Sequence, residues 1–390
     1  MNQLNNMLFA LLRSLLCGEE LDRSDLEGID EEGLEKLYRL AKKHDIAHLL
    51  GISLEKFGLL SDSAISKRIV KEQYVAIYRY ENLKYELERI SSVLEKEGIA
   101  YIPLKGAVIR ELYPECWMRT SCDIDVLVHE EVLDRAVESL VNELGYKANK
   151  KRDYHDISLF SESGVHLELH FNIKENVLQL DRVLSKAWEY AYPQAEGSYK
   201  YCLCNDFLIY QSVAHAAYHF VGGGCGLRPF IDLWLMTNAL EYSKEKLAEL
   251  CRESGIEGFF NEAMAFAKAI LEKGQRTELT DRIEAYIIEG GAYGTKEAHI
   301  AARQTARGGK RGYAISRIFT SYGNLKVRYP SLKSRAAAPI YQVRRWFDLI
   351  KDGRLEKAVN ELSINGNLDE NKANVIDGLM TDLGLKDYIK

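Results

Sequence analysis

The stretch from Cys122 to Val128, Cys-Asp-Ile-Asp-Val-Leu-Val, constrains the fold more than any other part of this chain. Successive residues of a β-strand point to opposite faces of a sheet. One face of this strand is apolar and belongs in a core, because it carries Ile124, Val126 and Val128. Asp123 and Asp125 share the other face, where two carboxylates raise each other's pKa unless a cation sits between them. The stretch therefore predicts a strand that binds a metal ion.

The residues around this strand predict a small sheet with helices packed on it. Residues 99–104 resemble a strand, 107–113 have helical spacing, and 130–144 carry a regular apolar stripe that ends at Gly145. Two more strands are expected at 155–160 and 165–171, joined by a Ser-Glu-Ser-Gly hairpin turn. The order strand, helix, strand, helix, strand, strand indicates an α+β fold with a small mixed sheet.

Helical regions flank the sheet domain. We expect an N-terminal helical region over 1–98, the sheet domain over 99–177 and a C-terminal helical domain over 178–390. In the N-terminal region a helix starts after Asp30, Gly51 interrupts the pattern, and a long helix ends at Gly98. In the C-terminal domain helices are expected at 206–220, 229–240, 256–273 and 280–289.

The glycine run at 222–226 has neither the Gly-Lys-Ser/Thr of a P-loop nor the strand context of a dinucleotide fingerprint. We interpret it as a break between helices that lets His215, His219 and Arg228 approach the strand that carries Asp123 and Asp125. Arg228 and Asp232 are one helical turn apart, so an ion pair between them is expected.

A third carboxylate stands in the 165–171 strand, where Glu168 shares the open face with His166 and His170. If the open faces of the two strands align, Glu168 joins the aspartate pair. Such hard oxygen ligands suit Mg²⁺ or Mn²⁺, above all when substrate phosphates complete the coordination. Two ions held in this way activate an attacking oxygen and stabilise a departing pyrophosphate. Two interpretations of both histidines remain open: they support the site or contact the substrate, or they are ordinary exposed residues.

A candidate phosphate-binding site precedes the Asp123–Asp125 strand in the sequence. Gly106 lets a backbone approach closely at the start of a helix whose N–H groups attract anions, and Lys105 adds positive charge. Arg119 lies four residues before Asp123, and its guanidinium group is suited to binding a phosphate by two parallel hydrogen bonds. Plain surface charge is the alternative for Lys105 and Arg119.

Together these motifs resemble the polymerase-β-like nucleotidyltransferase superfamily. That superfamily has a glycine-containing turn, a strand Asp-x-Asp and a third strand carboxylate, matched here by Leu-Lys-Gly-Ala at 104–107, Asp-Ile-Asp at 123–125 and Leu-Glu-Leu at 167–169. Further motifs are similar to a bacterial family of uncharacterised nucleotidyltransferases. They are Leu-Tyr-Pro at 112–114, Arg119, Glu-Leu-His at 168–170, Arg228 and Asp-Leu-Trp-Leu at 232–235. The resemblance covers about residues 100–240.

The resemblance implies a transferase that moves a nucleoside monophosphate from a nucleoside triphosphate (NTP) to a hydroxyl of an acceptor, with Mg²⁺ or Mn²⁺, and releases pyrophosphate. The expected metal ligands and catalytic residues are Asp123, Asp125 and Glu168. The expected nucleotide-binding residues are Lys105, Gly106, Arg119, His170 and Arg228. A small molecule, a protein and RNA all remain open as the acceptor.

One departure from the superfamily supports an alternative function. The usual turn is Gly-Gly or Gly-Ser, whereas this chain has Lys105, Gly106 and Ala107, and therefore lacks the serine hydroxyl that often contacts a phosphate. A non-catalytic nucleotide or ligand sensor on the same fold is the alternative that follows.

Charge and cysteine content narrow the remaining possibilities. The net charge of −6 gives no overall attraction to nucleic acid or anionic lipid. The seven cysteines are scattered and odd in number, which favours reduced thiols in a cytoplasmic protein. No signal peptide and no apolar run of the ~20 residues that span a bilayer is seen, so no membrane partner is expected.

The segment 298–347 stands apart, because it contains eleven Lys and Arg residues and no Asp or Glu. Aromatic residues are interleaved with the basic ones, as in grooves that bind nucleic acid. A nucleic-acid or partner-binding module is thus a further alternative. Packing of these side chains against the acidic N-terminal half is the favoured interpretation.

Overall fold

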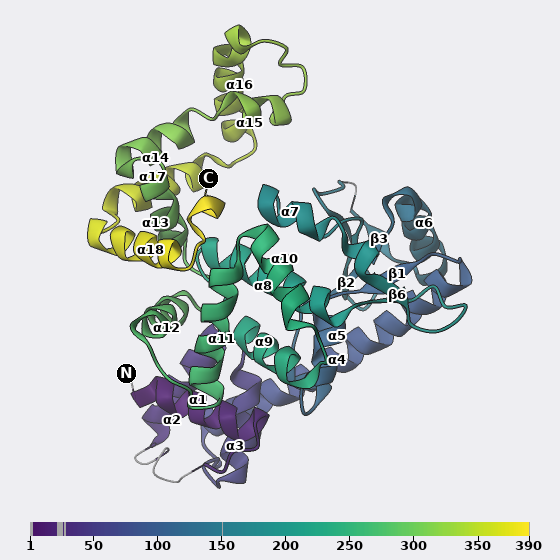
Figure 1. Ribbon diagram of the computed structural model, residues 1–390, viewed down its shortest axis with the longest axis vertical. Coiled ribbons are helices and arrows are strands. Elements are labelled where there is room, and N and C mark those ends of the chain that lie inside the picture. The colour runs from purple at the N-terminus through teal and green to yellow at the C-terminus, as the bar shows by residue number, and fades with distance from the viewer. Residues whose placement is uncertain (1–2, 22–25, 27–28, 150, 390) are drawn as a thin grey trace.

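The computed structural model describes residues 3–21, 26, 29–149 and 151–389. Figure 1 shows a small sheet at one side of the molecule, a helical body beside it, and a group of C-terminal helices that extends away from both. The predicted α+β class, with a mixed sheet between helical regions, is confirmed.

The main sheet has five strands in the order β1-β2-β5-β4-β3. Strand β2 runs parallel to β5, and the other neighbours are antiparallel, so the sheet is mixed as predicted. The predicted hairpin is β4–β5, whereas the short strand β3 was not predicted. The strands are β1 (Tyr101–Pro103), β2 (Asp123–Val128), β3 (Lys147–Ala148), β4 (Asp156–Phe160) and β5 (His166–His170).

Two helices cover the rear face of this sheet, α4 (Ala64–Lys96) and α6 (Leu133–Leu144). Their apolar stripes pack on the inward residues of β2 and β5, and the buried set includes Leu83, Ile90, Val93, Leu133, Leu140, Ile124, Val126, Val128, Leu167 and Leu169. Gly145 ends α6 in a left-handed conformation, as predicted. The rear face is therefore the dry side of β2 and β5.

The N-terminal helices begin where the sequence predicted. The carboxylate of Asp30 accepts a hydrogen bond from Gly33 N at the start of α2, and Ser63 caps α4 in the same way. The expected break at Gly51 was wrong, because Gly51 lies inside α3. The other helices here are α1 (Gln3–Leu16), α2 (Glu31–Lys43) and α3 (Leu50–Lys56).

The front face of the sheet meets the helical body across the largest hydrophobic core. Gly222 ends α8 at the predicted break. An additional hairpin, β6 (Ala191–Pro193) and β7 (Tyr201–Leu203), was not predicted, and β7 lies against β1. The body consists of α7 (Leu178–Leu184), α8 (Asn205–Val221), α9 (Arg228–Ala239), α10 (Lys244–Ser254), α11 (Glu257–Leu271) and α12 (Glu278–Gly290).

Six further helices form the C-terminal group of Figure 1. They are α13 (Lys296–Ala306), α14 (Gly309–Ile318), α15 (Tyr322–Arg328), α16 (Ala338–Lys351), α17 (Leu355–Asn367) and α18 (Glu370–Asp382). Arg317 pairs with Glu361 at 2.7 Å, and Arg345 donates to the carbonyl oxygens of Arg317 and Ile318. These partners belong to the C-terminal helices, so the expected packing against the N-terminal half was wrong for these two arginines.

Among the described residues, no helix is both long and apolar enough to cross a membrane.

Candidate active site

The carboxylates of the two parallel strands meet on the front face of the sheet. Asp125 lies opposite Glu168 in the β2–β5 register, and Asp123 lies opposite His166. Two groups of side chains each bring three ligand atoms within 4.8 Å of one another. The first consists of Asp123, His166 and Glu168, and the second of Asp125, Glu168 and His170. Glu168 belongs to both groups, as expected if the open faces align.

Two cationic groups neutralise the inner aspartate. Lys105 Nζ and His170 Nε2 each donate to Asp125 Oδ1, both at 2.9 Å. His170 Nε2 also lies 3.5 Å from Glu168 Oε2. His170 is buried, so it belongs to this network and is not an ordinary exposed histidine. The outer aspartate, Asp123, shows no side-chain hydrogen bond or ion pair among the described residues.

Burial and these neighbours give the carboxylates different pKa values. Burial raises the pKa of Asp123, and the charges of Asp125 and Glu168 raise it further. Burial also acts to raise the pKa of Asp125, but Lys105 and His170 hold it well below its ordinary value. Burial acts to lower the pKa of His170, yet hydrogen bonds to Asp125 and Glu168 raise it to about 8. Asp123 is thus the carboxylate with most to gain from an added cation.

The turn before α5 (Gly106–Ile109) brings Lys105 into this network. Lys105 has a φ of +44°, in the positive region that favours glycine. A Cβ on Gly106 would come within 2.7 Å of Arg119 Nη1 and 3.2 Å of Ser121 Oγ. Only glycine leaves the guanidinium in place.

Arg119 is held by a carboxylate from the helical body. Its Nη2 lies 2.9 Å from Asp232 Oδ2, its Nε lies 3.3 Å from both oxygens, and Tyr113 donates to Asp232 Oδ1 at 2.7 Å. The expected pair between Arg228 and Asp232 was therefore wrong. Arg228 instead donates to the carbonyl oxygen of Thr120 at 3.0 Å and pairs with Asp45. Each of the two side chains is thus bonded to residues outside α9.

Two cavities meet at Lys105. The carboxylate cavity, about 490 Å³, is lined by Asp123, Glu168, Glu175, Tyr154 and Tyr218, among others. The arginine cavity, about 400 Å³, is lined by Arg119, Arg228, His44 and Tyr293, among others. Both cavities are lined by Lys105, Gln211, His215 and His219. The last three residues belong to α8, so this helix lines the cavity that contains Asp123 and Glu168, as we expected from the glycine run that follows it.

Sequence reasoning missed Glu175, which positions a histidine in this cleft. His215 Nδ1 lies 2.7 Å from Glu175 Oε1, and the rings of His215 and His219 are 4.4 Å apart, edge to face. Burial acts to raise the pKa of Glu175, but His215 lowers it. Glu175 follows β5 in a loop with no regular pattern, so no signal in the sequence singled it out.

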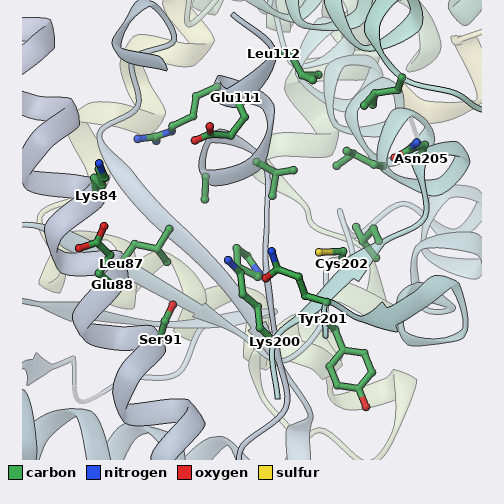
Figure 2. Close-up of a pocket in the computed structure, with 18 of the residues that line it drawn as sticks. Lys84, Leu87, Glu88, Ser91, Glu111, Leu112, Lys200, Tyr201, Cys202 and Asn205 are labelled. Atoms are coloured by element: carbon green, nitrogen blue, oxygen red, sulfur yellow. The ribbon is translucent and has the colours of Figure 1, made fainter. Parts of the chain in front are cut away.

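A separate rear cavity of about 520 Å³ lies behind the Lys105–Gly106 turn. Figure 2 shows its walls, with Lys84 and Glu88 of α4 on one side and Cys202 and Asn205 on the other. None of its lining residues lines the carboxylate or arginine cavity, and it contains none of the metal-ligand candidates. Asp123, Glu168 and His170 line the carboxylate cavity instead.

The comparison with protein families agrees with this geometry. Residues 30–272 match the family model described as uncharacterised nucleotidyltransferase. The chain belongs to this nucleotidyltransferase family. The match runs from the start of α2 to the end of α11, beyond the residues 100–240 on which the resemblance rested. No curated protein matches the chain.

The site of this nucleotidyltransferase fits a divalent cation. Carboxylates of Asp123 and Glu168 converge with one imidazole of His166, whose Nε2 is buried and without a hydrogen-bond partner. A buried, unpaired ring nitrogen beside two carboxylates is a donor set that a cation would complete. The two carboxylates suit Mg²⁺ or Mn²⁺, and the imidazole adds a ligand type that Zn²⁺ and Fe²⁺ accept more readily.

Proposed function

We propose that this protein transfers a nucleoside monophosphate from an NTP to a hydroxyl of an acceptor and releases pyrophosphate. The observation that carries the proposal is the pair of three-ligand groups that share Glu168 and lie beside Lys105. Membership of a nucleotidyltransferase family supports the same reaction. Asp123, Asp125 and Glu168 would hold Mg²⁺ or Mn²⁺, which, when bound, neutralises phosphate charge and activates the acceptor oxygen.

The charges of the cavities support a division of the substrates. The arginine cavity has Arg119, Arg228 and Lys105 on its wall, and one acid, Asp232, which is paired with Arg119. We assign the triphosphate to the boundary between the two cavities, next to Lys105 and Gly106, with the base in the arginine cavity. The acceptor would enter the carboxylate cavity.

His215 is our candidate for the group that accepts the proton of the acceptor hydroxyl. Its Nδ1 is bound to Glu175, so Nε2 is the nitrogen that remains to take a proton. Glu168, which the sequence predicts as a metal ligand and catalytic residue, has a pKa lowered by its hydrogen bond from His170. That bond makes Glu168 a weaker base and leaves it better suited to binding a cation.

The proposal is tested with NTPs labelled at the α- or γ-phosphate, incubated with the protein, cell extract and Mn²⁺ or Mg²⁺. Label retained only from the α position identifies nucleotidyl transfer, whereas label only from the γ position means a kinase and refutes the proposal. Asp125→Asn should abolish transfer with the fold intact. Asp134→Asn, an exposed aspartate on α6, is the matched control and should transfer normally.

A non-catalytic nucleotide sensor is the second candidate, and two features favour it. Lys105 is already paired with Asp125, and Ala107 stands where a serine hydroxyl often contacts phosphate. Metal-dependent NTP binding, measured by calorimetry, with no label transferred to any acceptor would support the sensor.

A further inference from the structure

Helix α16 exposes four apolar side chains, and the one side chain that it buries is polar. Ile340, Val343, Phe347 and Ile350 recur at intervals of three and four residues, and they are 71%, 46%, 66% and 56% exposed. Gln342 is the one residue of this helix that is buried. Helices of globular proteins place the apolar stripe inward. In α16 the apolar stripe faces outward instead, and it has no partner among the described residues.

Further apolar side chains are exposed on α14 and α17. Ile315, Ile318 and Phe319 are exposed at the end of α14, where the Phe319 ring lies 5.7 Å from that of Trp346. Leu355 and Val359 are exposed on α17, directly after α16. We call these exposed residues the outer face: Ile315, Ile318, Phe319, Ile340, Val343, Phe347, Ile350, Leu355 and Val359. In Figure 1, α16 lies at the end of the molecule farthest from the N-terminal helices.

Local packing holds this apolar stripe outward. Leu325, Tyr329 and Leu332 form a small core of their own, separate from the two larger cores, and Tyr341 of α16 packs on it. Trp346 donates to the carbonyl oxygen of Ile318 at 3.0 Å, and Tyr329 donates to Asp348 at 2.5 Å. The inward side of α16 is therefore occupied, which leaves its apolar stripe for another surface.

The charge around the outer face is mainly positive. Residues 309–367, which contain α14 to α17, carry twelve Lys and Arg and four acids, and two of these acids, Asp348 and Glu361, bond to Tyr329 and Arg317 within the group. Residues 298–347 carry eleven Lys and Arg and no acid, although the whole chain has a net charge of −6. Arg344 and Lys351 are exposed on the same side of α16 as Ile340 and Phe347. The surface that covers this face must accept aliphatic side chains and must also be negatively charged.

We propose that the outer face binds an anionic phospholipid surface, with α16 lying in the plane of the interface. A basic helix with Trp, Phe and aliphatic residues on one side is the form that surface-lying helices take. Nucleic acid would satisfy the arginines, but the aliphatic residues neither stack on bases nor bind phosphate. A second copy through the same face would bring two strongly basic surfaces together. The contact is with the surface of a bilayer, so it needs no membrane-spanning helix.

The test is co-sedimentation of the full chain with vesicles of phosphatidylglycerol mixed with phosphatidylcholine. We expect binding that weakens by about tenfold or more when the anionic lipid is left out, because each basic residue near the surface loses its attraction. Phe347→Ser should weaken binding to the mixed vesicles by about tenfold, since it removes apolar area from the interface. Val375→Ser is the matched control, because Val375 is equally exposed on α18 but outside the acid-free segment.

Each outcome decides the proposal. Loss of binding in Phe347→Ser but not in Val375→Ser, with both circular dichroism spectra unchanged, supports it. Failure to sediment with anionic vesicles, or equal sedimentation with phosphatidylcholine alone, overturns it. Light scattering without lipid is the second measurement. A wild-type dimer that Phe347→Ser converts to a monomer would show a protein interface instead and also overturn the proposal.

Discussion

Replacement of Asp232 by alanine is expected to destabilise this protein strongly. Asp232 accepts hydrogen bonds from Arg119 and from Tyr113, and all three side chains are largely buried. Removal of one partner from a buried ion pair costs about 3–5 kcal/mol, because the other charge stays buried and unpaired. The Tyr113 hydroxyl also loses its acceptor, which adds roughly 1–3 kcal/mol. We therefore expect the free energy of unfolding to fall by roughly 5 kcal/mol.

Urea denaturation followed by tryptophan fluorescence and far-ultraviolet circular dichroism measures this loss. The companion variant Arg119→Leu should be destabilised by a similar amount, and the double variant Arg119→Leu/Asp232→Ala by less than the two losses added together. Each single change leaves a buried charge alone, whereas the double change leaves none. Additive losses, or an Asp232→Ala protein within about 1 kcal/mol of wild type, would contradict the interpretation that the pair is buried and coupled.

Three further changes test other parts of the site. Gly106→Ala should weaken NTP binding by displacing the buried arginine beside it, whereas Gly366→Ala, a helical glycine with open space around it, should leave calorimetric binding unchanged. His215→Gln should lower kcat by about a hundredfold while KM for NTP stays constant, and Glu175→Gln should lower kcat less. Burial lowers the pKa of His48 from 6.5 to about 4 in the folded protein. The neutral buried imidazole therefore contributes its full stabilisation above pH 6.5, and the free energy of unfolding falls by roughly 3 kcal/mol as the pH drops toward 4. His48→Gln should remove that histidine's share of the slope in urea titrations at several pH values.

The fold was predictable wherever contacts within a few residues decide the local structure. The Asp30 cap, the long helix after Ser63 and the β4–β5 hairpin all depend on contacts within a few residues. The prediction at Gly51 was wrong because glycine destabilises a helix by only about 1 kcal/mol relative to alanine. The packing of α3 outweighs that cost. The short strands β3, β6 and β7 carry two or three residues each, too few for a period-two pattern to emerge.

The acidic face was predictable from strand alternation, and the place of Lys105 beside it from the turn at Gly106. Two strands with acids on alternate positions imply one acidic face, and the register of Asp125 with Glu168 realises it. The pairs Arg119–Asp232, Arg228–Asp45 and Glu175–His215 join residues 113, 183 and 40 positions apart. Such pairs depend on how helices of the body dock against the sheet, and a helical spacing such as that of Arg228 and Asp232 shows only what is near along one helix.

The length of α4 bears on how this chain can be cut into fragments. Its 33 residues extend for roughly 50 Å. Ile65 and Ile69 near its start belong to the large core, whereas Leu83 and Ile90 farther along belong to the core behind the sheet. A fragment that starts at Ile99 would keep every metal-ligand candidate yet expose the rear face of the sheet to water. Such a fragment should aggregate, and a soluble fragment that contains the metal-ligand candidates has to begin before Ala64.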